Sequence, residues 1–429
     1  MVGNPASPGW GQLSAADQEE QQLAPDTPVT TVVGITLSAP STLELSNVPL
    51  IGQDPSGSAS FGVLSTYPPT PCGLATFSAA LSKGLCANGS DVSVVRVADG
   101  SLCSDPRVIG ELVNGSATSA AAACALLNES DVAVVQHEYG IYGGVDGDEV
   151  VDIIGGLHIP SIVVAHTVLK DPTPHQRSVL EEIAAMAAQV VVMSEAARQR
   201  LCLGFDVDPR KVTTIAHGAK VPRRIAPAAR SDRPTLLTWG LLGPGKGIER
   251  VIDAMGSLHK LPLRPRYLIA GRTHPKVLAA DGEAYRDARA EQARLAGVAD
   301  SVAFDPSYRD VSSLTALVQT SAVVVLPYDS TDQVTSGVLV DAIASGRPVV
   351  ATAFPHAVEL LASGAGIVVD HDDQDALASA LHRLLTEPHL ATAMAAEAAR
   401  LAPQMAWPVV ANAYQRLAHR LLAERPALV

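Results

Sequence analysis

The chain has 429 residues, which is long enough for two domains that each bury a hydrophobic core. Hydrophobic residues make up 47% of it and charged residues only 17%, a composition that indicates a compact soluble protein and excludes an intrinsically disordered one. The net charge of −13 argues against a nucleic-acid partner and offers no general attraction to anionic lipid.

The cysteine pattern and the hydrophobic runs bear on the location of the protein. Five cysteines are scattered without C-x-x-C spacing: Cys72, Cys86, Cys103, Cys124 and Cys202. This odd, unpatterned set predicts reduced thiols, a cytoplasmic location and no structural zinc. No run reaches the roughly 18 apolar residues that span a bilayer, and the N-terminus lacks a basic start with an apolar core. We therefore expect no membrane span.

The beginning of the chain, residues 1–57, is rich in Pro, Ser, Gln and acidic side chains and has only weak strand-like pieces. It predicts a partly mobile N-terminal extension that leaves room for an added strand or hairpin. The fold core is expected to begin with the short apolar strand Ser60–Thr66, followed by a Pro-rich turn and a helix that runs to about Ala87. Gly73 lies at the start of this helix, a geometry that suits a phosphate.

Strands alternate with helical stretches along the rest of the chain. A first series of strands is expected at Val92–Val97, Val132–Val135, Ser161–Ala165, Val190–Met193 and Val212–Ile215. A second series is expected at Thr235–Trp239, Tyr267–Ala270, Val302–Phe304, Ala322–Leu326, Pro348–Ala351 and Gly366–Val369. Because these runs are apolar and β-branched, they predict parallel sheets that are buried on both faces by helices. A polar, basic segment, residues 220–233, joins the two series, so we expect an α/β protein with two Rossmann-like domains that face a central cleft.

One loop–helix–strand segment in the second series suggests a ligand site. Thr335 or Ser336 is the expected N-cap of its helix, and Gly337 lies in the first turn. Free backbone N–H groups and the positive end of the helix dipole make such a helix start an anion site. Gln333 precedes the first turn and Asp341 follows it by one turn, so a phosphate flanked by two hydroxyl-rich sugars would fit. An ordinary capped helix explains the segment equally well.

The spacing Gln333-x7-Asp341, followed by Ser345-Gly346 and Arg347-Pro348-Val349-Val350, resembles the E-x7-E signature of retaining glycosyltransferases of family 4, which have the GT-B fold. The resemblance implies that Gln333 reaches the donor sugar hydroxyls and that Asp341 holds the nucleotide ribose. The chain departs from the signature at both positions, with Gln and Asp in place of Glu. Both side chains keep acceptor oxygens, but Gln333 removes a negative charge beside the sugar, which argues against a charge-based role for it.

The GT-B resemblance also implies a division of the chain. Residues 58–222 would form the acceptor domain, residues 223–403 the nucleotide-sugar donor domain, and residues 404–429 a helix that crosses back to the first domain. Gly73 would close on the donor from the acceptor domain. Family members usually carry Gly-Gly at the place where this chain has Cys72-Gly73.

Two strand ends of the first domain carry further candidates. His137, Glu138 and Tyr139 lie in a loop that mixes ionisable, aromatic and glycine residues, and we favour acceptor binding over a merely structural turn. His166 ends the next strand in a V-x-x-H-T context. A lone histidine in such a place is usually a core residue, but the resemblance implies that His166 reaches the donor sugar at its reacting carbon.

A glycine-rich loop opens the second domain. Gly240 to Lys246 nearly matches the P-loop pattern G-x4-G-K-[ST], but Gly247 replaces the hydroxyl residue that would bind Mg²⁺. The resemblance implies instead that Lys246 grips the donor diphosphate. Family members carry an arginine where this chain has Leu241, and we expect Arg272, at the end of the next strand, to replace it.

No metal and no cofactor is expected. The twelve histidines are spread out, no H-x-x-x-H pair exists, and GT-B enzymes typically lack the D-x-D metal motif. Asp146-Gly147-Asp148 has that spacing, but acidic residues at a helix N-terminus explain it better. Residues 304–308 are expected near the nucleotide base, and this expectation rests only on their position in the chain.

The resemblance thus implies a retaining, metal-independent hexosyltransferase that uses a nucleotide-diphosphate sugar as donor and a saccharide as acceptor. The donor diphosphate would bind Lys246 and the amides of Ser336, Gly337 and Val338, and the acceptor hydroxyl would attack on the face that the nucleotide leaves. GDP-mannose is preferred slightly over UDP-glucose as the donor. A catalytically silent sugar-nucleotide binding protein is the main alternative, and a P-loop NTPase is the weaker one.

Overall fold

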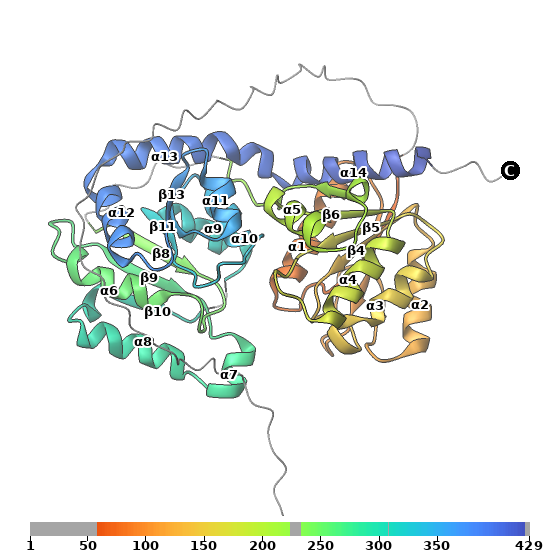
Figure 1. Cartoon of the computed structure of the whole chain (residues 1–429), viewed down its shortest axis with the longest axis horizontal. Coiled ribbons are helices and arrows are strands. Elements are labelled where there is room, and N and C mark those ends of the chain that lie inside the picture. The colour runs from red at the N-terminus through yellow and green to blue at the C-terminus, as the bar shows by residue number, and fades with distance from the viewer. Residues whose placement is uncertain (1–57, 224–232, 308, 425–429) are drawn as a thin grey trace, which may run out of the picture. The chain divides into compact units, whose positions relative to one another are not determined.

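The structure is a computed structural model in which residues 58–223, 233–307 and 309–424 are described (Figure 1). These residues form two parallel β-sheets, with helices between most of the successive strands. The N-terminal extension expected at residues 1–57, most of the joint between the two series (224–232) and Tyr308 lie outside the described residues. Within the described part of the chain, no helix has both the length and the apolar character that crossing a bilayer requires.

The first sheet contains seven strands in the order β3-β2-β1-β4-β5-β6-β7, and every neighbouring pair is parallel. Its strands are β1 (Phe61–Ser65), β2 (Val92–Val97), β3 (Val108–Leu112), β4 (Val132–His137), β5 (Ser161–Ala165), β6 (Gln189–Val192) and β7 (Val212–Thr214). Its helices are α1 (Gly73–Ala87), α2 (Ala117–Leu127), α3 (Glu149–Gly155), α4 (Pro174–Met186) and α5 (Glu195–Gly204).

The second sheet contains six strands in the order β10-β9-β8-β11-β12-β13, also all parallel. Its strands are β8 (Thr235–Trp239), β9 (Arg266–Ala270), β10 (Val302–Asp305), β11 (Val323–Leu326), β12 (Val349–Thr352) and β13 (Gly366–Val369). The helices of this part are α6 (Ile248–Leu258), α7 (Pro275–Asp281), α8 (Ala284–Leu295), α9 (Val311–Thr320), α10 (Gly337–Ala344), α11 (Pro355–Leu361), α12 (Gln374–Thr386) and α13 (Pro388–Leu401), and α14 (Trp407–Glu424) follows them.

Hydrophobic clusters cover both faces of each sheet, as the continuous apolar strands predict. Val63 and Leu64 are neighbours in β1, yet they belong to clusters on opposite sides of the first sheet. Leu236 and Leu237 of β8 divide in the same way in the second sheet. Successive side chains of a strand point to opposite faces, so both faces of these strands are removed from water.

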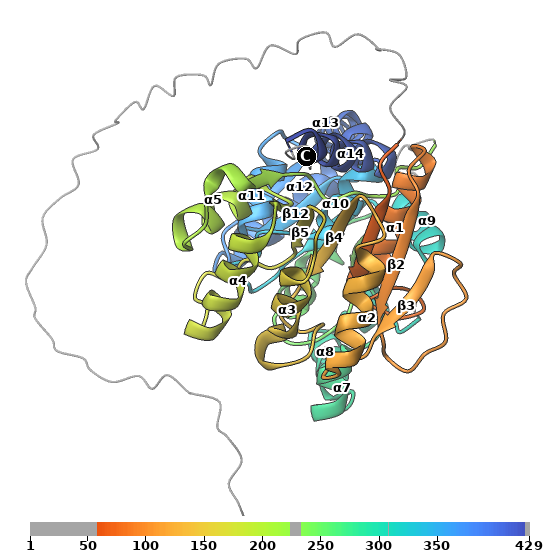
Figure 2. The same cartoon turned by 90° about the vertical axis from the view of Figure 1, so that its right-hand side faces the viewer.

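One strand of the first sheet, β3, was not expected from the sequence. It lies at the edge of the sheet, beside β2 (Figure 2). Gly110 and Glu111 interrupt its apolar pattern, and its residues alternate between exposed and partly buried before the buried Leu112. An edge strand has only one neighbouring strand and needs less apolar surface, so its sequence signal is weaker.

The last helix, α14, packs on α1 of the first sheet. A side-chain carbon on Gly84 of α1 would lie 2.9 Å from the carbonyl oxygen of Trp407, so glycine allows the two helices to approach closely. The side-chain amide of Asn88 donates to the carbonyl oxygen of Pro408 at 2.8 Å. The predicted fold class, with two Rossmann-like domains and a C-terminal helix that returns to the first, is confirmed.

Candidate active site

The N-terminus of α10 has the features of an anion site. The hydroxyl of Ser336 caps the helix by accepting from the amide of Leu339 at 3.3 Å. Among the described residues, the amides of Gly337 and Val338 have no hydrogen-bond acceptor. These two free donors coincide with the positive end of the helix dipole, an arrangement that favours a phosphate group.

Ser336 does not fit the donor contact that the sequence suggested for it. Its side chain is only 2% exposed. Its amide donates to Nδ1 of His356 at 2.9 Å, and its hydroxyl is used by the cap. The first free amide is therefore that of Gly337. The sequence could not reveal this, because His356 comes from α11, beyond the next strand.

Two histidines and an aromatic side chain stand beside this helix start. Phe77 of α1 makes edge-to-face contacts with His166 at 4.8 Å and with His217 at 5.1 Å between ring centroids. His217 lies against α10, because a side-chain carbon on Gly337 would come within 3.0 Å of its Nε2. The structure thus brings the start of α1, the end of β5, the segment after β7 and the start of α10 together.

His166 lies where the sequence placed it, directly after β5. Its Nε2 is 2.6 Å from the side-chain oxygen of Gln136, which makes this nitrogen the donor. Burial, with smaller contributions from His217 and His137, lowers the pKa of His166 to about 3. The ring is therefore neutral at pH 7 and serves as a hydrogen-bonding group rather than as a cation.

Lys246 is a cation with no carboxylate partner among the described residues. Its Nζ lies 4.5 Å from the centre of the Tyr328 ring, and burial lowers the pKa of its ammonium group. The loop is held against the end of β11: a side-chain carbon on Gly247 would lie 1.7 Å from the carbonyl oxygen of Pro327, and Gly247 has a φ of +62°. A partly buried ammonium that lies over a ring and has no carboxylate partner in the described part of the chain is well suited to an incoming anion.

The loop that carries Lys246 lies beside the loop that carries Arg272. The amide of Leu242 donates to the carbonyl oxygen of Arg272 at 2.9 Å, and the amide of His274 donates to the carbonyl oxygen of Leu242 at 2.8 Å. Arg272 is thus a neighbour of the glycine-rich loop, and its proposed replacement of the missing arginine at Leu241 stays a prediction.

Asp341 and Gln333 flank the helix start with free acceptor oxygens. The carboxylate of Asp341 has no hydrogen-bond donor among the described residues, and burial raises its pKa to about 7. The side-chain amide of Gln333 donates to the carbonyl oxygen of Thr335 at 3.1 Å, which leaves its oxygen available. An unpaired, largely buried carboxylate is costly, so its presence is informative about function.

Gly73 begins α1 and faces open space. A side-chain carbon at Gly73 would meet no heavy atom within 4 Å. The helix is capped by the thiol of Cys72, which accepts from the amide of Ala75 at 3.4 Å. The room that the sequence predicted for a ligand is thus present, although nothing in the fold itself requires glycine here.

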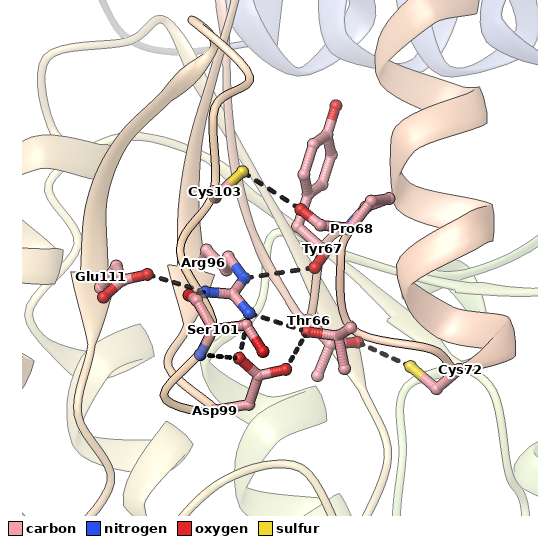
Figure 3. Close-up of polar contacts among 10 residues, drawn as sticks. Thr66, Tyr67, Pro68, Cys72, Arg96, Asp99, Ser101, Cys103 and Glu111 are labelled. Carbon is pink, nitrogen blue, oxygen red and sulfur yellow. Dashed lines mark hydrogen bonds and ion pairs between the residues drawn. The ribbon is translucent and has the colours of Figure 1, made fainter.

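The loop that leads to Gly73 is held by a buried arginine that the sequence did not single out. Arg96 of β2 is fully buried, and Figure 3 shows its guanidinium among the loops after β1 and β2 and strand β3. It donates to the carbonyl oxygen of Tyr67 (3.2 Å), the hydroxyl of Thr70 (3.0 Å), the carboxylate of Glu111 (2.8 Å) and the carboxylate of Asp99. Hydrogen bonds from Thr70, the amide of Ser101 and Arg96 lower the pKa of Asp99.

The three residues predicted to bind the acceptor are mostly engaged within the protein. His137 is the last residue of β4 and is 1% exposed, so direct contact with an acceptor does not fit its position. Glu138 accepts from the hydroxyl of Thr167 at 2.5 Å, and burial raises its pKa. The hydroxyl of Tyr139 donates to the carbonyl oxygen of Gln176 at 3.3 Å. Glu138 and Tyr139 remain candidates, because both are only partly buried.

The Asp146-Gly147-Asp148 sequence lies at the start of α3, as expected. His175 of α4 is 3.1 Å from the carboxylate of Asp146 and 3.5 Å from that of Asp148. In the portion of the chain that the structure describes, no three His, Cys, Asp or Glu side chains are arranged to hold a metal ion.

Comparison with known families and proteins shows that this chain is similar to glycosyltransferases. Residues 233–387 match the family model described as glycosyl transferases group 1. Two curated relatives are D-inositol 3-phosphate glycosyltransferases. That of Kineococcus radiotolerans is 29% identical over 280 residues, covering 60% of this chain and 62% of the relative, and that of Rhodococcus jostii is 27% identical over 272 residues, covering 58% of each chain. The chain thus spans about 60% of the length of these curated relatives.

Solved structures share the fold over most of the chain. Sucrose-phosphate synthase from Thermosynechococcus elongatus aligns with a TM-score of 0.66 and 17% identity, covering 86% of this chain and all of that one. Anabaena HepE, solved with UDP and glucose, aligns with a TM-score of 0.68 and 16% identity, covering 84% of this chain and all of that one. The resemblance to group 1 glycosyltransferases and the GT-B fold, both predicted from the sequence, are confirmed.

Proposed function

We propose that this chain, a protein of GT-B fold similar to family 4 glycosyltransferases, transfers a hexose from a nucleotide-diphosphate sugar to a hydroxyl group of an acceptor. One observation carries the proposal: two free amides at the start of α10 and the unpaired ammonium of Lys246 lie in the part of the chain that matches the family. Amide donors and a cation without a carboxylate partner suit a diphosphate, whose charge grows as the glycosidic bond breaks.

The site residues would divide the donor between them. The amides of Gly337 and Val338 and the ammonium of Lys246 would bind the diphosphate. Asp341 would accept hydrogen bonds from the ribose, and Gln333 would accept them from the sugar. His166, neutral at pH 7, would hydrogen-bond to the sugar near its reacting carbon. Preorganised donors of this kind stabilise the leaving diphosphate without a metal ion.

We propose that the reaction retains the configuration at the sugar carbon. A double displacement would need a nucleophilic carboxylate. Glu138, in the loop beside His166, accepts a hydrogen bond from Thr167, which engages its carboxylate within the protein and argues against it as the nucleophile. Attack by the acceptor hydroxyl on the face that the diphosphate leaves needs no such group.

The identities of the donor and of the acceptor are also proposals. GDP-mannose is the preference that arose from the sequence, and UDP-glucose is supported by HepE, which has been solved with it. The acceptor is a saccharide or, in view of the relatives that act on D-inositol 3-phosphate, a phosphorylated polyol.

The test must also distinguish two other functions from sugar transfer. A silent sugar-nucleotide binding protein is favoured by Gln333 and Leu241, which depart from the family pattern. A P-loop NTPase is disfavoured, because Gly247 has no room for the Ser or Thr side chain that would bind Mg²⁺.

The test is turnover of a panel of nucleotide sugars, including GDP-mannose and UDP-glucose, with saccharide and polyol-phosphate acceptors and a mass readout of the product. A product one hexose heavier than its acceptor supports the proposal. Donor binding without product indicates the silent binding protein, and hydrolysis of ATP with Mg²⁺ indicates the NTPase. Lys246→Ala is the matched inactive control.

A further inference from the structure

A second histidine, His217, stands closer to the start of α10 than the predicted His166, and the sequence resemblance gave it no role. In a helix the Cα–Cβ bonds tilt toward the N-terminus. Nε2 of His217 lies 3.0 Å from the place where a side-chain carbon of Gly337 would be. The nitrogen therefore lies against the first turn of α10, beside Gly337, whose amide is free.

The hydrogen bond on the far side of the ring determines its protonation. Nδ1 of His217 is 2.7 Å from the carbonyl oxygen of Gly218. A carbonyl oxygen only accepts, so Nδ1 carries the hydrogen, and in the neutral ring Nε2 presents a lone pair. A lone pair repels a phosphate oxygen. A second proton on Nε2 would turn this nitrogen into a charged hydrogen-bond donor.

The groups around His217 do not keep it protonated in the absence of a ligand. It faces Phe77 of α1, Trp407 of α14, Gly337 of α10 and two further histidines, His166 and His356. Burial lowers the pKa of His217 to about 4, and it lowers those of His166 and His356 to about 3 and about 4. Among the described residues, no carboxylate forms an ion pair with His217.

His356 occupies the amide of the N-cap residue Ser336. It is 4% exposed, and its Nδ1 accepts from the amide of Ser336 at 2.9 Å. Its hydrogen is therefore on Nε2, which has no acceptor among the described residues. The start of α10 thus has the two free amides of Gly337 and Val338 and, beside them, the lone pair of His217 instead of a third donor.

We propose that His217 takes up a proton when the nucleotide-sugar donor binds and then donates from Nε2 to the donor diphosphate. The proton would supply the positive charge that the family obtains from the arginine replaced here by Leu241. Two negative charges within about 4 Å favour the imidazolium strongly even at an effective dielectric constant of about 20. The inference rests on the proposed function, because it assumes that the diphosphate binds at α10.

The test is isothermal titration calorimetry of donor binding at pH 6.5 in buffers with different enthalpies of ionisation. The probes are UDP-glucose and GDP-mannose. Their diphosphates carry no group that titrates near neutral pH, whereas the terminal phosphate of a free nucleoside diphosphate does. The dependence of the observed enthalpy on the buffer gives the number of protons taken up. We expect uptake close to one proton per donor.

Three variants make the result specific. His217→Asn keeps a donor toward the Gly218 carbonyl but cannot be protonated, so it should take up no proton. It should also bind the donor about tenfold more weakly at pH 6.5, the loss expected for a hydrogen bond between charged groups, and less so at pH 8.5. His217→Gln also cannot be protonated and should give the same result as His217→Asn. It replaces His217→Asn as the test if that variant does not fold. His259→Asn is the matched control, because Nδ1 of His259 makes the same kind of bond, 2.9 Å to the Met255 carbonyl, away from α10. It should match the wild type.

Donor binding without proton uptake, or uptake that His217→Asn and His217→Gln retain, would overturn this inference and leave the proposed function intact. Absence of binding by either donor to both the wild type and the His259 variant would overturn the proposed function and this inference together.

Discussion

Asp341→Asn should stabilise the ligand-free protein while weakening donor binding. The carboxylate has no hydrogen-bond donor among the described residues, and burial raises its pKa from 3.8 to about 7. A difference of one pKa unit corresponds to about 1.4 kcal/mol, so the charged group costs about 4 kcal/mol at pH 8. The asparagine amide is still a buried polar group and costs part of this free energy, so we expect a net gain of about 2–3 kcal/mol in the free energy of unfolding.

The pH dependence has a definite sign. Because the pKa of Asp341 is higher in the folded than in the unfolded state, the folded protein binds more protons between about pH 4 and pH 7. The cost of the carboxyl group is therefore nearly absent below pH 4, grows as the pH rises and is complete above pH 7. The advantage of the asparagine variant should follow the same course.

Calorimetric unfolding of the wild type and of Asp341→Asn, compared at pH 8 and again at pH 4.5, tests this reasoning. At pH 8 the melting temperature should rise by on the order of 5–10 °C, and at pH 4.5 the two proteins should differ little. Asp287→Asn, an exposed position in α8, should shift it by about 1 °C or less. An equal or lower melting temperature for Asp341→Asn at pH 8, or a difference that does not depend on pH, would refute the account of this carboxylate.

Four further predictions can be tested by kinetics, binding and unfolding measurements. Lys246→Ala should lower kcat and raise the donor KM, with a combined loss in kcat/KM of roughly ten- to a hundredfold. Asp341→Ala should mainly raise KM, and steady-state kinetics with the reverse pattern would mean that the donor lies elsewhere. Activity should persist in excess EDTA, and a loss that only Mg²⁺ or Mn²⁺ restores would contradict this. Removal of residues 1–50 should leave a folded protein with unchanged donor affinity, which calorimetry and binding assays check. Arg96→Leu should cost about 2–4 kcal/mol of unfolding free energy, because it leaves the carbonyl oxygen of the buried Tyr67 and the partly exposed carboxylates of Asp99 and Glu111 without their donor. Arg294→Leu, which breaks an exposed pair with Glu291, should cost less than about 1 kcal/mol, and similar effects would show that the Arg96 network is unimportant.

The parts of the fold that local sequence determines were predictable. Runs such as Val132–Val135 are apolar and β-branched, so they predict buried parallel strands whatever their surroundings. Strand β3 was not predicted, because Gly110 and Glu111 interrupt its apolar pattern and because an edge strand needs less burial.

The candidate site was predictable only where a short motif carries it. Gly337 and Lys246 were found because a helix start and a glycine-rich loop have local signatures. Ser336 and His137 were assigned to ligands too readily, since the hydrogen bond from Ser336 to His356 and the burial of His137 arise from tertiary packing. His217 was not identified from the sequence, because its proximity to Gly337 joins residues that are far apart in the chain.

The central claim is that the start of α10 and Lys246 hold the diphosphate of a nucleotide sugar. A crystal structure of the full chain with UDP or GDP bound tests it most directly. We predict a phosphate oxygen within hydrogen-bond distance of the Gly337 amide, another near Nζ of Lys246, and ribose hydroxyls on the Asp341 carboxylate. A nucleotide bound away from α10, or one whose ribose and diphosphate exchange these places, would contradict the account.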